Sequence, residues 1–233
     1  MSSLNALEVR NLLAIGSVIQ AGTDGPVAIR LRKLGTETAT SVTVTTATNI
    51  VLVGSTTTDT IVFATDTTYG AVVDRINSTD RWEAKILDAL RSKASASTLV
   101  DGAITAGTDA NGIVDWDVKE DTSASLEIPV CLSTKRNFDS PTGHRVILQE
   151  IVYYVNMGTA AADSVQVWLR RGATETQQFG ALSVDSTKTT ITFASGRGSI
   201  GGKNDDEIIV LVKDAATLAN STSNFVRAVG ILE

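Results

Sequence analysis

The sequence contains few of the residues on which enzyme chemistry depends. Its 233 residues include one cysteine, one histidine and 3 prolines, and aromatic residues make up only 5%. One cysteine excludes an intramolecular disulfide, and one histidine with one cysteine cannot supply a structural or catalytic zinc site. Cys131 lies in the apolar run Ile128–Leu132 and is predicted to be a buried, inert thiol. No cofactor is expected.

The single histidine would have to serve in any Ser-His-Asp or Cys-His catalytic system. His144 ends the segment Ser140–His144, which reads as a turn that leads into a strand. A solvated loop histidine is the better interpretation of such a position. We therefore predict that the protein is not an enzyme.

Basic charge and long hydrophobic runs are also scarce. The net charge is −6 and the isoelectric point about 4.9, and the densest basic positions, Arg30–Lys33 and Arg170–Arg171, are short. A nucleic-acid binder needs a basic surface that displaces phosphate counterions, so nucleic acid is not an expected partner. The apolar runs have strand length and the first ten residues lack the pattern of a signal peptide. Neither a membrane span nor secretion is predicted.

Carboxylates alone could still bind a metal ion. Asp115, Asp117, Glu120 and Asp121 have ligand chemistry that suits calcium, but the first two alternate with apolar residues, as on the wet face of a strand. The segment Asp205–Glu207 resembles a turn that enters a buried strand. Neither cluster has the loop pattern of an EF-hand, so we predict no metal site and keep calcium as the weaker alternative.

A glycine motif is present without the context that would give it a function. Gly196–Gly201 matches the pattern G-x-G-x-x-G of dinucleotide-binding loops. Such a loop must be followed by a helix whose N-terminus faces the pyrophosphate. Here the next structured segment, Glu207–Val212, has the pattern of a strand. The motif is predicted to be a glycine-rich hairpin.

What the chain does have is threonine, and this favours a mainly β fold. The 31 threonines are β-branched and polar, which suits the half-exposed face of a strand. Residues 1–100 are predicted to form a small α+β module of the order β-β-β-α-β, which would be a docking domain. The strands of that order are expected at 41–45, 49–53 and 60–64, with another from Trp82, and a further half-exposed strand is expected before them at 27–32.

The same module is predicted to contain one helix near residues 68–77. Tyr69, Val72, Val73 and Ile76 form one apolar stripe, and Thr67 or Thr68 can cap the N-terminus. Before the first strand, Leu4–Leu13 could form a short helix or equally an arm that packs on a neighbouring subunit.

Residues 101–233 are predicted to form an antiparallel β-sandwich or jelly-roll-like domain. The Ala/Ser/Gly/Thr-rich stretch from Lys93 to Gly112 is the expected boundary. Turn residues separate a series of strands without a convincing helix between them. These strands are expected at 112–118, 125–132, 145–155, 164–171, 189–193, 207–212 and 225–232.

Five segments follow one pattern, in which Thr-rich strands lead to a helix ending in an Ile-Asn pair and then to another strand. They are Ser41–Val44, Asn49–Leu52, Ile61–Phe63, Thr68–Asn77 and Trp82–Ala84. This order resembles a module of tailed-bacteriophage virion proteins. The segment Gly201–Val210 is similar in style to the sandwich domains of phage head-decoration and fibre proteins.

The resemblance implies a structural component of a virus particle. Such a protein would decorate or cement the capsid, or form part of a head or tail appendage, through contacts with the major capsid protein or other virion proteins. A homo-oligomer is expected, made in the host cytoplasm and located in the virion. The resemblance assigns no functional residue.

Two other functions are consistent with the residues. Tyr153, Tyr154 and Trp168 could form a stacking platform for a surface glycan or receptor, although aromatic residues more often fill a core. The remote alternative is a carboxylate-based glycan hydrolase. It stays open because its two acidic residues would meet only in the folded chain, where the sequence alone does not show them.

Overall fold

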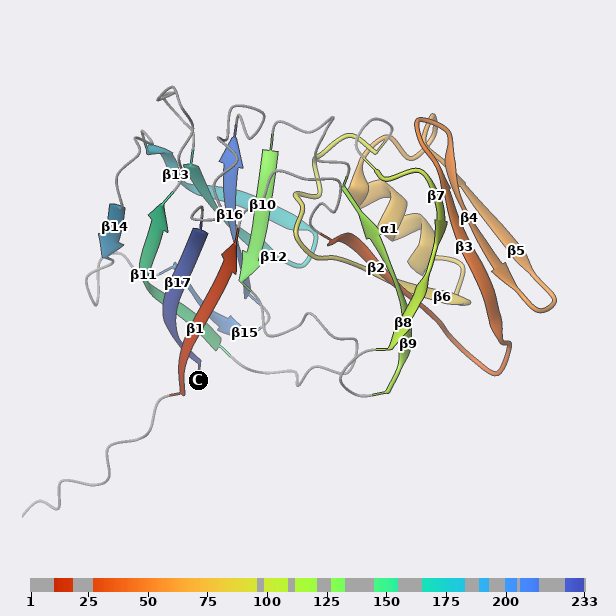
Figure 1. Cartoon of the computed structure of the whole chain (residues 1–233), viewed down its shortest axis with the longest axis horizontal. Coiled ribbons are helices and arrows are strands. Elements are labelled where there is room, and N and C mark those ends of the chain that lie inside the picture. The colour runs from red at the N-terminus through yellow and green to blue at the C-terminus, as the bar shows by residue number, and fades with distance from the viewer. Residues whose placement is uncertain are drawn as a thin grey trace, which may run out of the picture. The chain divides into compact units, whose positions relative to one another are not determined.

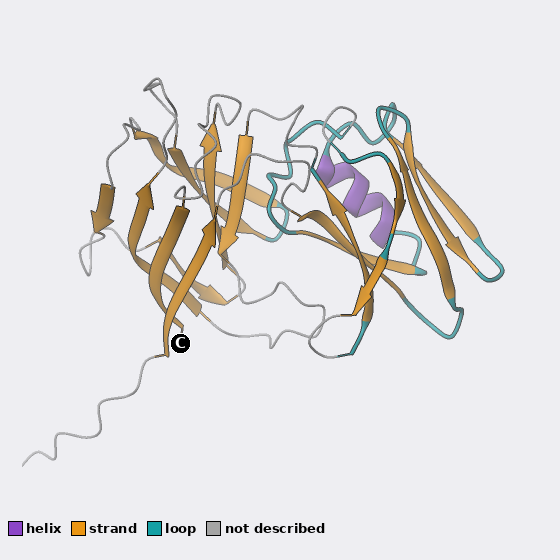
Figure 2. Cartoon of the chain, viewed as in Figure 1, coloured by secondary structure: helices purple, strands orange, loops and turns teal. Residues whose placement is uncertain are grey.

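A computed structural model describes residues 11–18, 27–95, 99–108, 112–120, 127–132, 145–154, 165–182, 189–192, 200–204, 206–213 and 225–232. The described residues form many strands and one helix, which confirms the prediction of a mainly β protein (Figures 1 and 2). None of the described helical residues forms a segment long and apolar enough to cross a membrane.

The chain divides into two compact units. The terminal unit contains both ends of the chain and consists of Met1–Gln20, Leu132–Leu211 and Thr217–Glu233. The inserted unit consists of Ala21–Cys131 with Val212–Ala216. The division does not fall at residue 100, because strands after that position pair with strands before it.

One sheet of the inserted unit has the strand order β6-β2-β9-β8. Its strands are Trp82–Ile86 (β6), Val27–Lys33 (β2), Val114–Lys119 (β9) and Ala106–Thr108 (β8). Leu31 of β2 stands opposite Ala84 of β6 and Trp116 of β9 in antiparallel register. All three side chains are buried, so the alternation predicted for this strand places one face of the sheet in the core.

The second sheet of the inserted unit has the order β5-β4-β3-β7. Its strands are Thr58–Val62 (β5), Asn49–Gly54 (β4), Ala39–Thr45 (β3) and Gly102–Ile104 (β7). The predicted hairpin of β3 and β4 is confirmed, and its turn contains Ala47 with a φ of 60°. Val42, Val44, Ile50, Leu52 and Ile61 are buried and alternate with half-buried or exposed residues.

The predicted helix is confirmed as α1, Tyr69–Asn77, and it lies between these two sheets (Figure 2). The side chain of Thr68 caps it by accepting a hydrogen bond from the Ala71 N–H at 3.2 Å. The buried stripe of Tyr69, Val72, Val73 and Ile76 joins one hydrophobic core with residues from both sheets. Helix and sheets therefore form a single packed unit.

The last residue of the helix is bound to strand β6. The Asn77 amide accepts a hydrogen bond from the Ala84 N–H at 2.7 Å and donates one to the Ala84 carbonyl at 3.2 Å. The side chain thus satisfies both backbone groups of one residue, as a neighbouring strand would do.

The terminal unit is built around a sheet of the order β1-β17-β11-β14, with β15 also pairing with β11. These strands are Asn11–Val18 (β1), Phe225–Leu232 (β17), Arg145–Tyr154 (β11), Thr189–Thr192 (β14) and Ile200–Asn204 (β15). β17 pairs with β1 on one side and with β11 on the other, both antiparallel. The first and last described strands are therefore neighbours.

The fourth sheet has the order β10-β16-β12-β13. Its strands are Glu127–Leu132 (β10), Asp206–Lys213 (β16), Val165–Arg171 (β12) and Thr174–Leu182 (β13). β12 and β13 form an antiparallel pair with two register shifts. Val167, Leu169, Ile208 and Leu211 are buried.

Most predicted strands are confirmed, and the differences fall at polar or short segments. β13, β15, β7 and β8 were not expected. The N-terminal helix predicted for Leu4–Leu13 is wrong from Asn11 onward, where the chain is strand β1, and residues 1–10 lie outside the described part. Pairing with β17 accounts for β1, since a local pattern cannot show a partner two hundred residues away.

Candidate interaction surface

The acidic residues of β9 are engaged by a basic residue of the neighbouring strand. Arg30 donates through Nε and Nη2 to the two carboxylate oxygens of Asp117, each at 2.7 Å, and its Nε lies 3.4 Å from Asp115 Oδ2. Asp115 is buried, so its predicted place on a wet strand face is wrong. Gly107 of β8 stands opposite it and lacks the Cβ that would lie 2.9 Å from Asp115 Oδ1.

The other predicted acidic positions have similar structural partners. Glu120 is fully buried and accepts a hydrogen bond from Lys93 Nζ at 2.8 Å. Glu207 accepts one from Arg170, whose Nε also donates to Glu175 at 2.9 Å. Asp121 and Asp205 lie outside the described residues. Across the ranges that the structure describes, no three His, Cys, Asp or Glu residues form a group that could hold a metal ion.

The three aromatic residues of the predicted platform belong to two different sheets. Tyr153 and Tyr154 are consecutive residues of β11, whereas Trp168 is in β12. Trp168 is half-buried and donates its indole N–H to Gln166 Oε1 at 3.1 Å. No single sheet brings the three aromatic residues together, and the stacking platform stays a prediction.

The remaining sequence candidates are only partly within the described chain. His144 and Gly196–Ser199 lie outside it. The motif's last residues, Ile200 and Gly201, belong to β15, which was not expected, and the strand predicted after the glycines at 207–212 is confirmed as part of β16. Cys131 lies on β10, and its burial stays a prediction.

A surface free of charged side chains covers the solvent side of β3, β4 and β5, and we call it the β3–β5 face. Every member is half-buried or exposed, and each alternates along its strand with a residue of the core. It consists of Ser41, Thr43, Thr45, Asn49, Val51, Val53, Thr58, Thr60 and Val62. The chain has no charged residue between Glu37 and Asp59. The turns that border the β3–β5 face are therefore uncharged as well.

The register of the sheet arranges these residues in rows. Val51 stands between Thr43 and Thr60, and Val53 stands between Ser41 and Thr58. Cross-strand pairs of β-branched residues stabilise a sheet through side-chain contact, so the rows are locally favourable without charge. The result is a valine stripe on the central strand with threonine and serine on either side.

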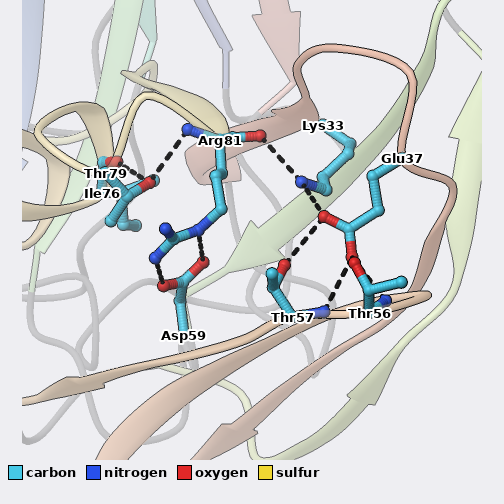
Figure 3. A network of polar contacts seen from close by, with 8 residues as sticks. All are labelled: Lys33, Glu37, Thr56, Thr57, Asp59, Ile76, Thr79 and Arg81. Atoms are coloured by element: carbon cyan, nitrogen blue, oxygen red, sulfur yellow. Dashed lines mark hydrogen bonds and ion pairs between the residues drawn. The ribbon is translucent and has the colours of Figure 1, made fainter.

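A carboxylate clamps the rim of this sheet to the strand β2 (Figure 3). Glu37 follows β2, and its Oε1 accepts hydrogen bonds from the Thr56 N–H at 2.6 Å and the Thr57 N–H at 2.8 Å. Its Oε2 accepts from Thr57 Oγ1 and from Lys33 Nζ, both at 2.8 Å. The Lys33 hydrogen bond first, and then those of Thr56 and Thr57, hold the pKa of Glu37 well below its usual range.

A second ion pair continues the clamp toward the helix (Figure 3). Arg81, in the loop before β6, binds both carboxylate oxygens of Asp59 on β5. Asp59 raises the pKa of Arg81 through this hydrogen bond and its charge. Lys33 also donates to the Arg81 carbonyl at 3.3 Å and lies over the Trp82 ring, 5.4 Å from its centre. Glu37 and Asp59 are thus each paired with a cation, whereas Asp101 accepts a hydrogen bond from the Thr46 N–H, in the turn after β3, at 2.7 Å.

Sequence reasoning missed this clamp and the charge-free face. A run without charge from Thr38 to Thr58 was visible in the sequence and could have indicated the face. Comparison with known proteins adds no assignment, since no family model and no curated protein matches the chain.

Proposed function

We propose that this chain is a structural protein that binds protein partners through the β3–β5 face, as a component of a virus particle. It would decorate or cement a capsid, or form part of a head or tail appendage. The partner is then the major capsid protein or another virion protein. The described residues of the terminal unit would belong to a jelly-roll-like sandwich.

The observation that carries the proposal is the absence of charge from an exposed sheet face. Charged residues make up 20% of the chain, yet none of the nine face residues is charged. Burying a lysine or glutamate in an interface removes hydration that must be replaced, whereas valine and threonine methyl groups gain from burial. The centres of protein interfaces are depleted of charged residues for this reason.

The assignment to a virus particle rests on the order of elements. Thr-rich strands β3, β4 and β5 are followed by a helix that ends at Ile76-Asn77 and by the strand β6. This is the order in the phage virion module that the sequence resembles. The Ile76-Asn77 pair has a structural role in this chain, because the Asn77 amide binds the end of the helix to Ala84 of β6.

The test combines localisation with a surface variant. Particles purified from the source of the chain should contain the protein at a constant ratio to the major capsid protein, measured by quantitative mass spectrometry. Val51→Lys places a charge at the centre of the β3–β5 face and should reduce particle occupancy by at least about tenfold. Thr176→Lys, at an exposed position of β13, is the matched control and should leave occupancy unchanged.

Each outcome decides a different part of the proposal. Particles that lack the protein would refute the virion assignment. If Val51→Lys is folded by circular dichroism and occupies particles as fully as the wild type, the role of the face is refuted.

A further inference from the structure

We propose that strand β5 pairs with β5 of a second copy of this chain, which joins two four-stranded sheets into one. β5 is the edge strand of its sheet, with β4 on one side, and it runs along the outer margin of the unit (Figure 1). The proposal concerns the backbone edge of β5, whereas the proposed function concerns the solvent-exposed face of the same sheet.

The hydrogen-bond phase of β5 leaves three residues facing the edge. Two backbone hydrogen bonds lie at the ends of the β4–β5 pair. The Gly54 N–H donates to the Thr57 carbonyl, and the Phe63 N–H donates to the Thr48 carbonyl, and both residue pairs continue the register of the two strands. In an antiparallel ladder the bonded positions alternate. The odd-numbered residues of β5 therefore bond to β4, and Thr58, Thr60 and Val62 direct their N–H groups outward. The Val62 carbonyl already accepts hydrogen bonds from the Thr65 and Asp66 N–H groups at 3.0 and 2.9 Å, so the carbonyls left for a partner strand are those of Thr58 and Thr60.

The other edges of the inserted unit are covered or short. Strand β6 is an edge, but the Asn77 amide occupies both outward-facing backbone groups of its central residue, Ala84. Edge strands β7 and β8 have three residues each. A five-residue edge that is regular, lacks proline and has four β-branched residues is the kind of edge that natural proteins otherwise protect.

The register of β5 is complementary to itself. With a twofold axis at Thr60, Thr60 stands opposite its copy, Thr58 opposite Val62, and Asp59 opposite Ile61. The Thr60 pair then exchanges two backbone hydrogen bonds, and the Val62 N–H of each copy donates to the Thr58 carbonyl of the other, about four bonds in total.

Charge also favours a second copy as the partner. A symmetric contact brings like groups together, so a charged edge repels its own copy. The only charge on β5, Asp59, is 7% exposed and bound to Arg81 on the core side of the sheet. The uncharged rows of the β3–β5 face continue across the twofold axis without like charges meeting.

The expected contact is small. One strand pair buries less than the roughly 1,200 Å² at which specific stable interfaces begin, so the dimer should dissociate on dilution. The fraction of dimer would rise where many copies are held at high local concentration, as on a particle.

Sedimentation velocity of the full-length chain over a range of concentrations tests the proposal. We expect a concentration-dependent dimer in the wild type. Thr60→Pro removes an outward-facing N–H without removing a bond to β4, and Thr60→Lys places two ammonium groups across the twofold axis. Each should raise the dimer dissociation constant by at least about tenfold. Thr43→Lys, on the face but two strands away from the edge, and Thr176→Lys should leave dimerisation intact.

A wild-type chain that stays monomeric at every concentration would overturn the proposal. So would a dimer that neither Thr60 variant weakens, which would point to another edge such as β1. If Thr60→Pro lowers the melting temperature, Thr60→Lys decides, because lysine keeps the backbone groups. Thr43→Lys separates the two proposals, since it should weaken partner binding at the face and spare the dimer.

Discussion

At the scale of single residues, Glu37 links pH to stability. Its carboxylate is held charged in the folded chain by Lys33 and by the donors of Thr56 and Thr57, which lowers its pKa. The unfolded chain, with a pKa near the ordinary 4.5, takes up a proton first as the pH falls. The stabilisation is therefore complete at neutral pH and is lost progressively in acid.

We expect Glu37→Gln to lower stability at pH 7 and to flatten its acid dependence. Below about pH 5 the wild type should lose stability faster than the variant, so the two unfolding curves converge. Urea unfolding followed at several pH values between neutral and acid measures this. Parallel curves for the two proteins would contradict the proposed linkage.

Gly54 offers an independent check on the same clamp. A Cβ at this position would lie 2.6 Å from Glu37 Cδ, so Gly54→Ala should expel the carboxylate. Because both variants then lose the same contacts, Gly54→Ala should cost little in a Glu37→Ala background. Additive losses would show that the glycine is needed for another reason.

The buried pair of Glu120 and Lys93 should be sensitive to removal of one partner. Lys93→Met leaves a fully buried carboxylate without this cation and should lower the free energy of unfolding by about 3–5 kcal/mol. Lys93→Met/Glu120→Gln removes the buried charge and should recover part of the loss. Chemical denaturation of the three proteins measures both effects, and equal losses in the single and double variants would contradict the argument.

At the scale of elements, Asn77 couples the helix to β6. Asn77→Ala removes two hydrogen bonds and leaves both backbone groups of the buried Ala84 without them, which should cost about 1–3 kcal/mol. Ser78→Ala, which removes an exposed hydroxyl bonded to the Arg75 carbonyl, should change stability by no more than about 0.5 kcal/mol. Thermal unfolding measures both losses of stability. Similar losses in the two variants would contradict the coupling of helix and strand through Asn77.

Elements with local patterns were predictable from sequence. Helix α1 shows its apolar stripe and its cap in consecutive residues, and β2 to β5 show the alternation of a half-buried sheet. Strand β13 was missed because its sequence, Thr174–Leu182, is mostly polar and gains its structure from pairing with β12. β1 depends in the same way on β17.

The contacts of the site were less predictable, since they join residues far apart in the sequence. The burial of Asp115 requires Arg30 from one neighbouring strand and Gly107 from another. The clamp around Glu37 requires the turn between β4 and β5. Composition could reveal a charge-free run, but only register shows that its threonines and valines form one face.

At the scale of the whole molecule, β17 closes the terminal unit. It pairs with β1 and β11 at once, so removal of residues 225–233 should leave that unit without its central strand. The inserted unit, built almost entirely from a continuous segment, should keep its fold. Trp82 and Trp116, in edge contact with ring centres 5.7 Å apart, report on it through near-ultraviolet circular dichroism.

The truncated chain should retain the signal of this tryptophan pair and lose strand content in the far ultraviolet. Trp168→Phe in the same background removes the remaining tryptophan and makes the assignment unambiguous. Loss of the tryptophan-pair signal on truncation would show that the two units depend on each other.

The adjacent first and last strands also determine how the molecule would respond to tension. Asn11 stands beside Leu232 and Val18 beside Phe225, so a pull applied at Asn11 and Leu232 opens the ladder at one end. The interstrand bonds would then rupture successively, as in a zipper, and not together under shear. Traction on these ends should separate β1 at low force, whereas attachment through an internal loop would avoid that weak point.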